Sequence, residues 1–256
     1  MPIRFILLIL LGFVANAFAD KPHVVMLIAE KEYLTKDTLP KFAASHLAND
    51  HRVTILQPTA DDRNSFPGLA EAMKDADLLV VSVRRRTPPE AELNLIRKFV
   101  TAGKPVIGIR TANHAFALRG DQKPPAGHAA WQTWDPDVFG GAYHGHHGKK
   151  LATTAQRVQD AGEHPILKGV SKDAFPTGGS LYEVRPLKKG TTVLLDGRAE
   201  SIKQSEPVAW TFTRADGGRS FYTSLGHEQD FQNPNFIKLL TNAVHWCLQP
   251  QPASQP

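Results

Sequence analysis

The most informative segment of this chain of 256 residues is Val106-Ile107-Gly108-Ile109-Arg110-Thr111-Ala112-Asn113-His114. Its first four residues have the composition of a short buried strand, and the polar residues that follow turn into a short helix. A strand that runs directly into such a turn predicts the geometry of a nucleophile elbow. The residue in the nucleophile position is Arg110, and a guanidinium stays protonated and cannot attack a carbonyl. We therefore expect a place that binds charge or oxygen atoms, without covalent acyl chemistry.

Strand and helix patterns alternate in the residues before this stretch. The predicted strands cover residues 23–29, 53–56 and 77–83, and the predicted helices cover residues 39–47, 68–74 and a segment between Pro88 and Gly103. Repeated units of strand and helix imply a parallel sheet with helices on both faces. The sequence thus predicts an α/β fold, in which ligands bind outside the carboxyl ends of the strands.

The second half of the chain changes character. Residues 120–150 are rich in Gly, Pro, His and aromatic residues without a clear period, and a loop of that length is usually functional. A last helix is expected after Asn233 as N-cap, with Pro234 at its first position and Cys247 on its apolar face. We expect one domain over residues 20–248 and a disordered Pro/Gln-rich tail over residues 249–256. Further strands are expected at residues 151–156, 181–184, 191–195, 208–213 and 219–224.

The composition excludes several classes of protein. Hydrophobic residues make up 41% and charged residues 21% of the chain, which is ordinary for a globular domain and excludes disordered and collagen-like chains. The single cysteine excludes an intramolecular disulfide and a cysteine-rich zinc site. The formal charge is +5, but the basic residues are scattered and the one run, Arg84-Arg85-Arg86, is short. No nucleic-acid partner is therefore expected.

Residues 1–19 have the pattern of an export signal. Arg4 supplies the positive charge, residues 5–14 form an apolar run, and Ala17-Phe18-Ala19 gives the small-x-small cleavage pattern before Asp20. The run is too short for a permanent membrane helix, which needs roughly 20 apolar residues. No later segment is long and apolar enough to span a membrane. We therefore expect an exported protein, periplasmic or extracellular, without membrane insertion after signal cleavage.

The elbow and two later motifs together resemble the ThuA-like (trehalose-utilisation) family. The later motifs are residues 164–170 and the closing segments 207–210 and 219–228, so the resemblance covers about residues 23 to 248. It implies a flavodoxin-like, class I glutamine amidotransferase-like fold, with a mostly parallel sheet, helices on both faces and additional C-terminal strands. Class I amidotransferases carry a cysteine in a Gly-x-Cys-x-Gly elbow with a downstream His and Glu. Arg110 stands in its place here, so glutamine hydrolysis is not implied, whereas the family name implies a carbohydrate.

The histidines form a local cluster. Five of the eleven lie within 34 residues, namely His114, His128, His144, His146 and His147. Neutral imidazoles at the spacing of His144 and His146 are able to chelate Zn²⁺ or another divalent metal, although no cofactor is certain. Histidine is equally suited to proton transfer near neutral pH. A metal site, catalytic or substrate-binding histidines, and an exposed loop without specific function all stay open at this point.

We expect a pocket at the carboxyl edge of the sheet that takes a carbohydrate or related polyol. His114 or His227 would be its general acid or base, with Glu228 orienting that histidine or activating water. If the chain is an enzyme, it would be a carbohydrate-active hydrolase or lyase. The expected substrate-binding residues are Arg110, Asn113, Trp131, Tyr143, His144 and Arg84.

Several alternatives stay open beside this hypothesis. Arg110 also fits a structural ion pair, and Trp131 also fits a residue that packs the long loop onto the domain. Glu30 and Glu32, after the first strand, are most simply surface residues. The missing cysteine also fits a non-catalytic sugar-binding protein, and the histidines fit a metal-dependent hydrolase.

Overall fold

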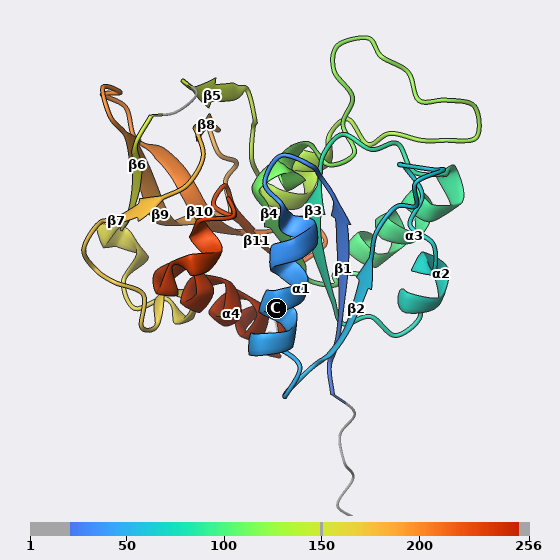
Figure 1. Cartoon of the computed structure of the whole chain (residues 1–256), viewed down its shortest axis with the longest axis horizontal. Coiled ribbons are helices and arrows are strands. Elements are labelled where there is room, and N and C mark those ends of the chain that lie inside the picture. The colour runs from blue at the N-terminus through green and yellow to red at the C-terminus, as the bar shows by residue number, and fades with distance from the viewer. Residues whose placement is uncertain (1–20, 149–150, 251–256) are drawn as a thin grey trace, which may run out of the picture.

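The computed structural model describes residues 21–148 and 151–250 (Figure 1). The predicted export signal, residues 1–19, and residues 251–256 of the predicted tail lie outside the described residues. The strands are β1 (His23–Ala29), β2 (Arg52–Leu56), β3 (Leu78–Val83), β4 (Val106–Ile109), β5 (Gly145–His147), β6 (Thr153–Arg157), β7 (Phe175–Thr177), β8 (Leu181–Glu183), β9 (Thr191–Ala199), β10 (Glu206–Thr213) and β11 (Arg219–Thr223). The helices are α1 (Thr35–His46), α2 (Leu69–Ala72), α3 (Glu90–Thr101) and α4 (Pro234–Leu248), with short helical turns η1 (Arg110–His114), η2 (Asp135–Phe139), η3 (Gln159–Ala161), η4 (Pro165–Leu167) and η5 (Asp230–Gln232).

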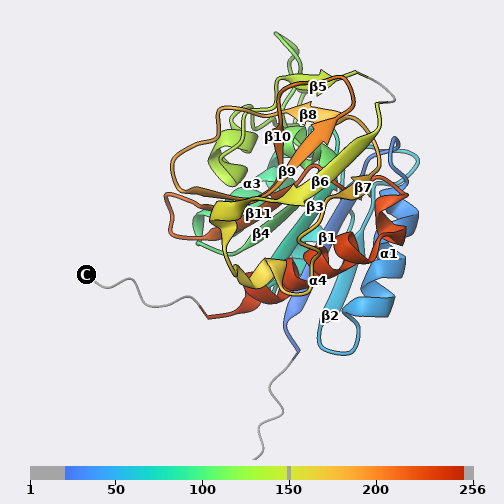
Figure 2. The same cartoon turned by 90° about the vertical axis from the view of Figure 1, so that its left-hand side faces the viewer.

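Nine strands form one mixed sheet in the order β2-β1-β3-β4-β11-β10-β9-β6-β7. The first five are parallel neighbours, and β10, β9, β6 and β7 continue the sheet in antiparallel pairs. Figure 2 shows these antiparallel strands together at one edge. A small second sheet pairs β5 with β8. The predicted α/β class is thus confirmed, with a mostly parallel first part and additional C-terminal strands.

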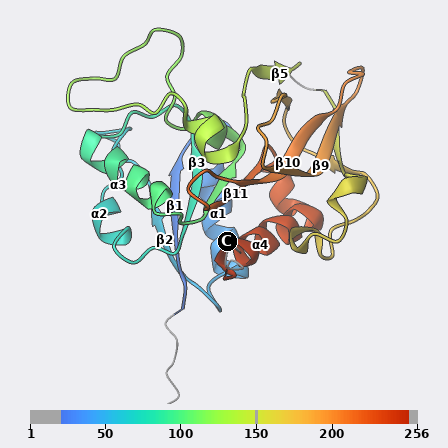
Figure 3. The ribbon, with the colours of Figure 1, turned by 180° about the vertical axis from the view of Figure 1, so that it is seen from behind.

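Two apolar cores cover the two faces of the sheet. Because side chains alternate along a strand, Val24 and Met26 of β1 face α1 and α4, whereas Val25 and Leu27 face α2 and α3. Figures 1 and 3 show these two pairs of helices on opposite faces. Cys247 is buried in the core under α4, as predicted, and burial raises the pKa of its thiol to about 12. The helices therefore leave the carboxyl ends of the parallel strands open at one edge.

The element boundaries differ from prediction where distant contacts decide them. Helix α1 begins at Thr35 rather than at residue 39, because the Glu30 carboxylate accepts a hydrogen bond from the Thr35 backbone N–H at 2.8 Å. That acceptor lies outside the helix, so no local capping pattern indicates the start. The predicted loop over residues 120–150 contains η2 and β5, and β7 was not predicted.

No helix in the described part of the chain is long and apolar enough to cross a membrane.

Candidate functional site

The carboxyl ends of β1, β3, β4 and β11 meet at one edge of the sheet, beneath the long loop that follows η1 (Figure 1). The elbow is present there, since β4 runs directly into η1 and Arg110 has a φ of 51°. A positive φ is unfavourable for a residue with a side chain, and it persists where surrounding contacts hold it. The Tyr222 hydroxyl supplies such a contact by donating a hydrogen bond to the Arg110 carbonyl at 2.6 Å.

The Arg110 side chain turns into the protein. Its guanidinium carbon lies 4.4 Å from the ring centroid of Tyr33 and 4.6 Å from that of Tyr182. The guanidinium also donates hydrogen bonds to the carbonyls of Ser224 and Ser180, the latter at 3.1 Å. Arg110 is only 1% exposed and lines neither of the cavities described below.

Arg110 therefore ties the elbow to two other segments and lines neither cavity, although from the sequence we predicted that it binds substrate. The structural ion pair considered as its alternative is not formed among the described residues either, since the partners of Arg110 there are carbonyls and aromatic rings. Gly179 makes room for this arrangement. A Cβ atom at Gly179, where φ is 76°, would lie 2.3 Å from a guanidinium nitrogen of Arg110.

Two adjoining cavities lie over the elbow. We call them the Asp135 cavity and the His227 cavity, each after one residue of its wall. Their volumes are about 660 Å³ and about 770 Å³, respectively. They share His114, Tyr143 and two other residues of their walls, Arg119 and His146. The structure therefore brings several predicted site residues to one place. Of the predicted set, Asn113, His114, Tyr143, His144 and His146 line the Asp135 cavity, and Arg84, His114, Tyr143, His146 and His227 line the His227 cavity.

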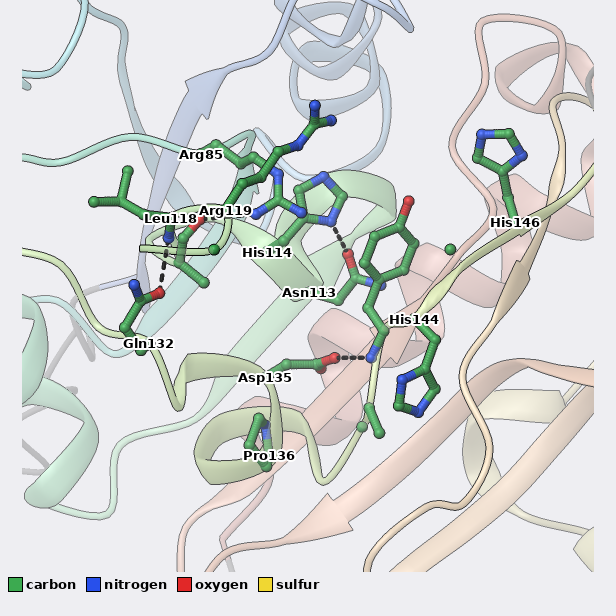
Figure 4. A pocket seen from close by; sticks show the side chains of 16 residues that line it. Arg85, Asn113, His114, Leu118, Arg119, Gln132, Asp135, Pro136, His144 and His146 are labelled. Carbon is green, nitrogen blue, oxygen red and sulfur yellow. Dashed lines mark hydrogen bonds between the residues drawn. The ribbon is translucent and has the colours of Figure 1, made fainter. Parts of the chain in front are cut away.

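His114 lines both cavities, and its imidazole is neutral near pH 7. It is 5% exposed, and burial, followed by the positive charges of Arg85, Arg84 and Arg119, lowers its pKa to about 2. Its Nδ1 lies 2.6 Å from Oδ1 of Asn113, so Nδ1 carries the proton and donates it, leaving a lone pair on Nε2 (Figure 4). His114 therefore offers a hydrogen-bond acceptor at Nε2 near neutral pH, whereas from the sequence we predicted a general acid or base at His114 or His227.

Asp135 is the carboxyl group in the wall of the Asp135 cavity, and it was not among the predicted site residues. Its Oδ2 accepts a hydrogen bond from the Tyr143 backbone N–H at 2.9 Å, and its buried Oδ1 has no partner among the described residues. Burial raises the pKa of this carboxyl to about 7, against a smaller opposing effect of the Tyr143 hydrogen bond. Asp135 therefore gains and loses a proton near neutral pH, which is the property required of a general acid or base.

Asn113 completes this polar wall of the Asp135 cavity. It is 1% exposed, and its Nδ2 is buried without a hydrogen-bond partner among the residues that the structure describes. The unpaired donor of Asn113 and the unpaired acceptor of Asp135 line the same cavity (Figure 4). Leaving such groups unpaired costs free energy, and buried polar groups without partners are typical of a functional site.

His227 and Glu228 lie at the end of β11 and differ in their surroundings. His227 is half-buried in the wall of its cavity, with its ring 5.9 Å from that of Tyr33. Glu228 is exposed and lines neither cavity. The buried carboxylate of this turn is Asp230, which accepts hydrogen bonds from the backbone N–H groups of Gly178, Gly226 and His227 at 2.7 to 2.9 Å. Asp230 therefore shapes the turn that presents His227.

The remaining predicted residues are dispersed. Trp131 lies outside both cavities because it packs against Trp134 and donates a hydrogen bond to Asp137, as its structural alternative required. Within residues 21–148 and 151–250 no three His, Cys, Asp or Glu side chains converge to hold a metal ion, and the predicted pair His144 and His146 gains no third ligand. His147 instead hydrogen-bonds to Glu206 at 3.2 Å.

The two acidic residues after β1, Glu30 and Glu32, differ in their burial. Glu32 is exposed and pairs with Arg84 at 3.0 Å. Glu30 is not a surface residue as expected, since it is 3% exposed. It accepts hydrogen bonds from the backbone N–H groups of Glu32, Tyr33 and Thr35 and from the Thr35 hydroxyl. Glu30 therefore holds the loop that places the Tyr33 ring on Arg110.

Comparison with known proteins agrees with this architecture. A ThuA-like protein from Bacteroides uniformis ATCC 8492 superposes with a TM-score of 0.61 and 16% sequence identity, covering 92% of this chain and 95% of that chain. A ThuA-like protein from Parabacteroides merdae ATCC 43184 gives a TM-score of 0.59 and 16% identity, covering 93% and 95%. These identities show a shared fold alone. A search of curated proteins gives no match.

The sequence itself matches one family, described as ThuA, trehalose utilisation, over residues 24–247. This match spans the whole sheet from β1 and nearly all of α4. The chain therefore belongs to the ThuA family.

Proposed function

We propose that this protein binds a carbohydrate or related polyol in the Asp135 cavity and transfers a proton to or from it. The observation that carries the proposal is the buried pair of unpaired groups, Nδ2 of Asn113 and Oδ1 of Asp135. A hydroxyl group both donates and accepts hydrogen bonds, so the hydroxyls of a sugar match a donor and an acceptor that belong to the wall of one cavity. The lone pair of His114 Nε2 offers a further acceptor.

The roles of the residues follow from their protonation states. Asp135, with a pKa of about 7, is the group that exchanges a proton with the substrate. His114 stays neutral and orients a hydroxyl. Two titratable groups whose surroundings push their pKa values in opposite directions are typical of acid–base sites. With Arg110 in the elbow, no covalent acyl intermediate forms at that position.

The experiment is incubation with trehalose and a panel of other disaccharides, followed by analysis of the products by mass spectrometry and NMR. The Asp135→Asn variant keeps the hydrogen bond to the Tyr143 backbone but cannot exchange a proton. Loss of general acid–base catalysis typically lowers a rate by about 10²–10⁴-fold. Asp173→Asn is the matched control, since Asp173 is exposed and lines neither cavity. Equal turnover by wild type and Asp135→Asn would contradict the proposed role of Asp135.

A non-catalytic sugar-binding protein is the second candidate, and it rests on Arg110 in place of the nucleophile. It predicts a sugar that raises the melting temperature and is recovered chemically unchanged. A metal-dependent hydrolase would need metal in protein purified without a His tag. Less than about 0.2 metal per chain in elemental analysis would contradict it.

Export forms a separate part of the proposal. It is supported by the charged start, apolar run and Ala17-Phe18-Ala19 pattern of the first residues. The test is fractionation of the source cells and intact mass analysis. Protein that begins at Asp20 in a periplasmic or secreted fraction supports export, and full-length protein in the cytoplasm contradicts it.

A further inference from the structure

Two arginines at the cavity wall have no acidic partner. Arg85 follows β3, is half-buried, and donates one hydrogen bond to the Ala117 carbonyl at 3.1 Å, while its Nε is buried without a partner. Arg119 is exposed, and its guanidinium makes no hydrogen bond to the described residues. Neither forms a salt bridge within residues 21–148 and 151–250. Both line the Asp135 cavity, beside His114 (Figure 4).

These two cations repel one another. Burial, and then the positive charge of Arg119, lowers the pKa of Arg85, and the charge of Arg84 adds to this effect. Like charges held close together with no carboxylate between them cost free energy, which a bound anion would recover.

Other arginines of the chain differ in how many of their donors are paired. Arg84 pairs with Glu32 at 3.0 Å, and Arg214, which is almost fully buried, pairs with Asp216 and donates further hydrogen bonds to backbone carbonyls. Arg86 and Arg110 also have a buried Nε without a partner among the described residues, but neither of them lines the Asp135 cavity. Arg85 donates a hydrogen bond to one carbonyl, that of Ala117, and its side chain lines the Asp135 cavity.

The acidic groups of the cavity do not balance this charge. The carboxyl group in its wall is that of Asp135. Oδ2 of Asp135 accepts a hydrogen bond from the Tyr143 backbone N–H, and Oδ1 has no partner among the described residues. The other titratable groups of its wall are His114, His144, His146 and Tyr143, none of which is anionic at neutral pH. The wall beside Arg85 is therefore positively charged.

We propose that Arg85 and Arg119 form an anion subsite, and that the sugar or polyol bound by this protein carries a carboxylate or a phosphate group. That the ligand is a sugar or polyol rests on the proposed function, whereas its negative charge is inferred independently, from Arg85 and Arg119. Guanidinium groups bind both anions through paired N–H donors. The subsite lies next to the groups that contact hydroxyls, so an acidic sugar would span both.

Anion binding would also change His114. The charges of Arg85, Arg84 and Arg119 follow burial among the causes of its low pKa. A bound anion offsets these charges and makes the imidazole a stronger base.

The test is calorimetric titration of the full mature protein with D-glucose, D-glucuronate and D-glucose 6-phosphate. We expect one or both of the charged sugars to bind at least about tenfold more tightly than glucose, which corresponds to one charge-assisted hydrogen bond. Arg85→Gln should weaken the charged ligand by about 10- to 100-fold and leave glucose unchanged. Arg198→Gln removes an exposed charge of β9 that lines neither cavity, and it should leave all three affinities unchanged. If Arg85→Gln weakens the affinity for glucuronate, the subsite binds a carboxylate; if it weakens the affinity for glucose 6-phosphate, the subsite binds a phosphate.

The outcomes separate this inference from the proposed function. Equal affinity for glucose and both charged sugars, or a charged-sugar affinity that is unchanged by Arg85→Gln, would overturn the anion subsite while leaving the sugar cavity intact. Binding of the charged sugars through Arg85 without any chemical turnover would support the subsite and contradict catalysis. If none of the three sugars binds and inorganic phosphate does not raise the melting temperature, the subsite is overturned as well.

Discussion

Replacing Arg110 by methionine tests whether this residue is part of the framework or of the binding site. Methionine keeps a long, flexible side chain and fills most of the space between Tyr33 and Tyr182, but it removes the charge and both hydrogen bonds. The carbonyls of Ser224 and Ser180 then lose their donor. If the account of the elbow is right, stability falls, because the sheet edge and the segment that carries Ser180 are no longer tied together.

The magnitude follows from the contacts. Two hydrogen bonds from a charged donor contribute about 1.5–3 kcal/mol each, and two buried cation–π contacts about 1–2 kcal/mol each. The variant no longer has to bury a charge, which offsets several kcal/mol of that sum. We therefore predict a net loss of about 2–4 kcal/mol. For a domain of this size, that loss lowers the melting temperature by about 5–15 °C.

The assay is scanning calorimetry of the wild type, Arg110→Met and the control Arg198→Met, together with sugar binding. The control removes an exposed arginine and should change stability by less than about 0.5 kcal/mol. A melting temperature of Arg110→Met within about 2 °C of the wild type, combined with lost sugar binding, would refute the structural role. That result would make Arg110 a substrate-binding residue after all.

Three further predictions follow from the same structure. Burial raises the pKa of Asp135 to about 7, so its contribution to stability is fully present below pH 3.8 and is lost as the pH rises through 7. Wild type should therefore lose up to about 4 kcal/mol relative to Asp135→Asn between pH 4 and pH 8 in urea unfolding, and parallel curves would contradict this. Cys247, which is buried with a pKa of about 12, should resist iodoacetamide in the folded protein and react on unfolding; rapid alkylation of folded protein would contradict its place in the core. Gly179→Ala should lower stability by about 1–3 kcal/mol through its contact with Arg110 and its positive φ, and an unchanged melting temperature would show that this segment moves freely.

The parts of the fold that were predictable are those with local signals. The strand-to-turn pattern at residues 106–114 predicts the elbow, and the continuous apolar runs at β1 and β3 predict a sheet that is buried on both faces. The start of α1 was missed because its first backbone N–H is capped by Glu30, which lies before the helix. The short strands β5 and β7 depend on pairing with distant strands, and three residues carry too little pattern to indicate them.

The location of the site could be predicted from the sequence, but the roles of its residues could be predicted only in part. The rule for carboxyl ends of parallel strands correctly gathers His114, Asn113 and Arg84 at one edge. It does not distinguish Arg110, which turns inward between rings about 70 residues or more away in sequence. Asp135 lacked any sequence signal beyond its place in the His-rich loop, because its raised pKa arises from burial under residues that the fold brings around it.

The most direct test of the central claim is to map sugar binding onto the protein by NMR. Glucose, glucuronate and glucose 6-phosphate are titrated into protein labelled with ¹⁵N and ¹³C, and side-chain shifts are followed at Asn113, His114 and Asp135. We predict that the largest changes occur at the Asn113 amide, the His114 ring and the Asp135 carboxyl, because these groups hold unpaired hydrogen-bonding positions in the wall of the Asp135 cavity. Binding that leaves these three side chains unchanged and shifts residues elsewhere would contradict it.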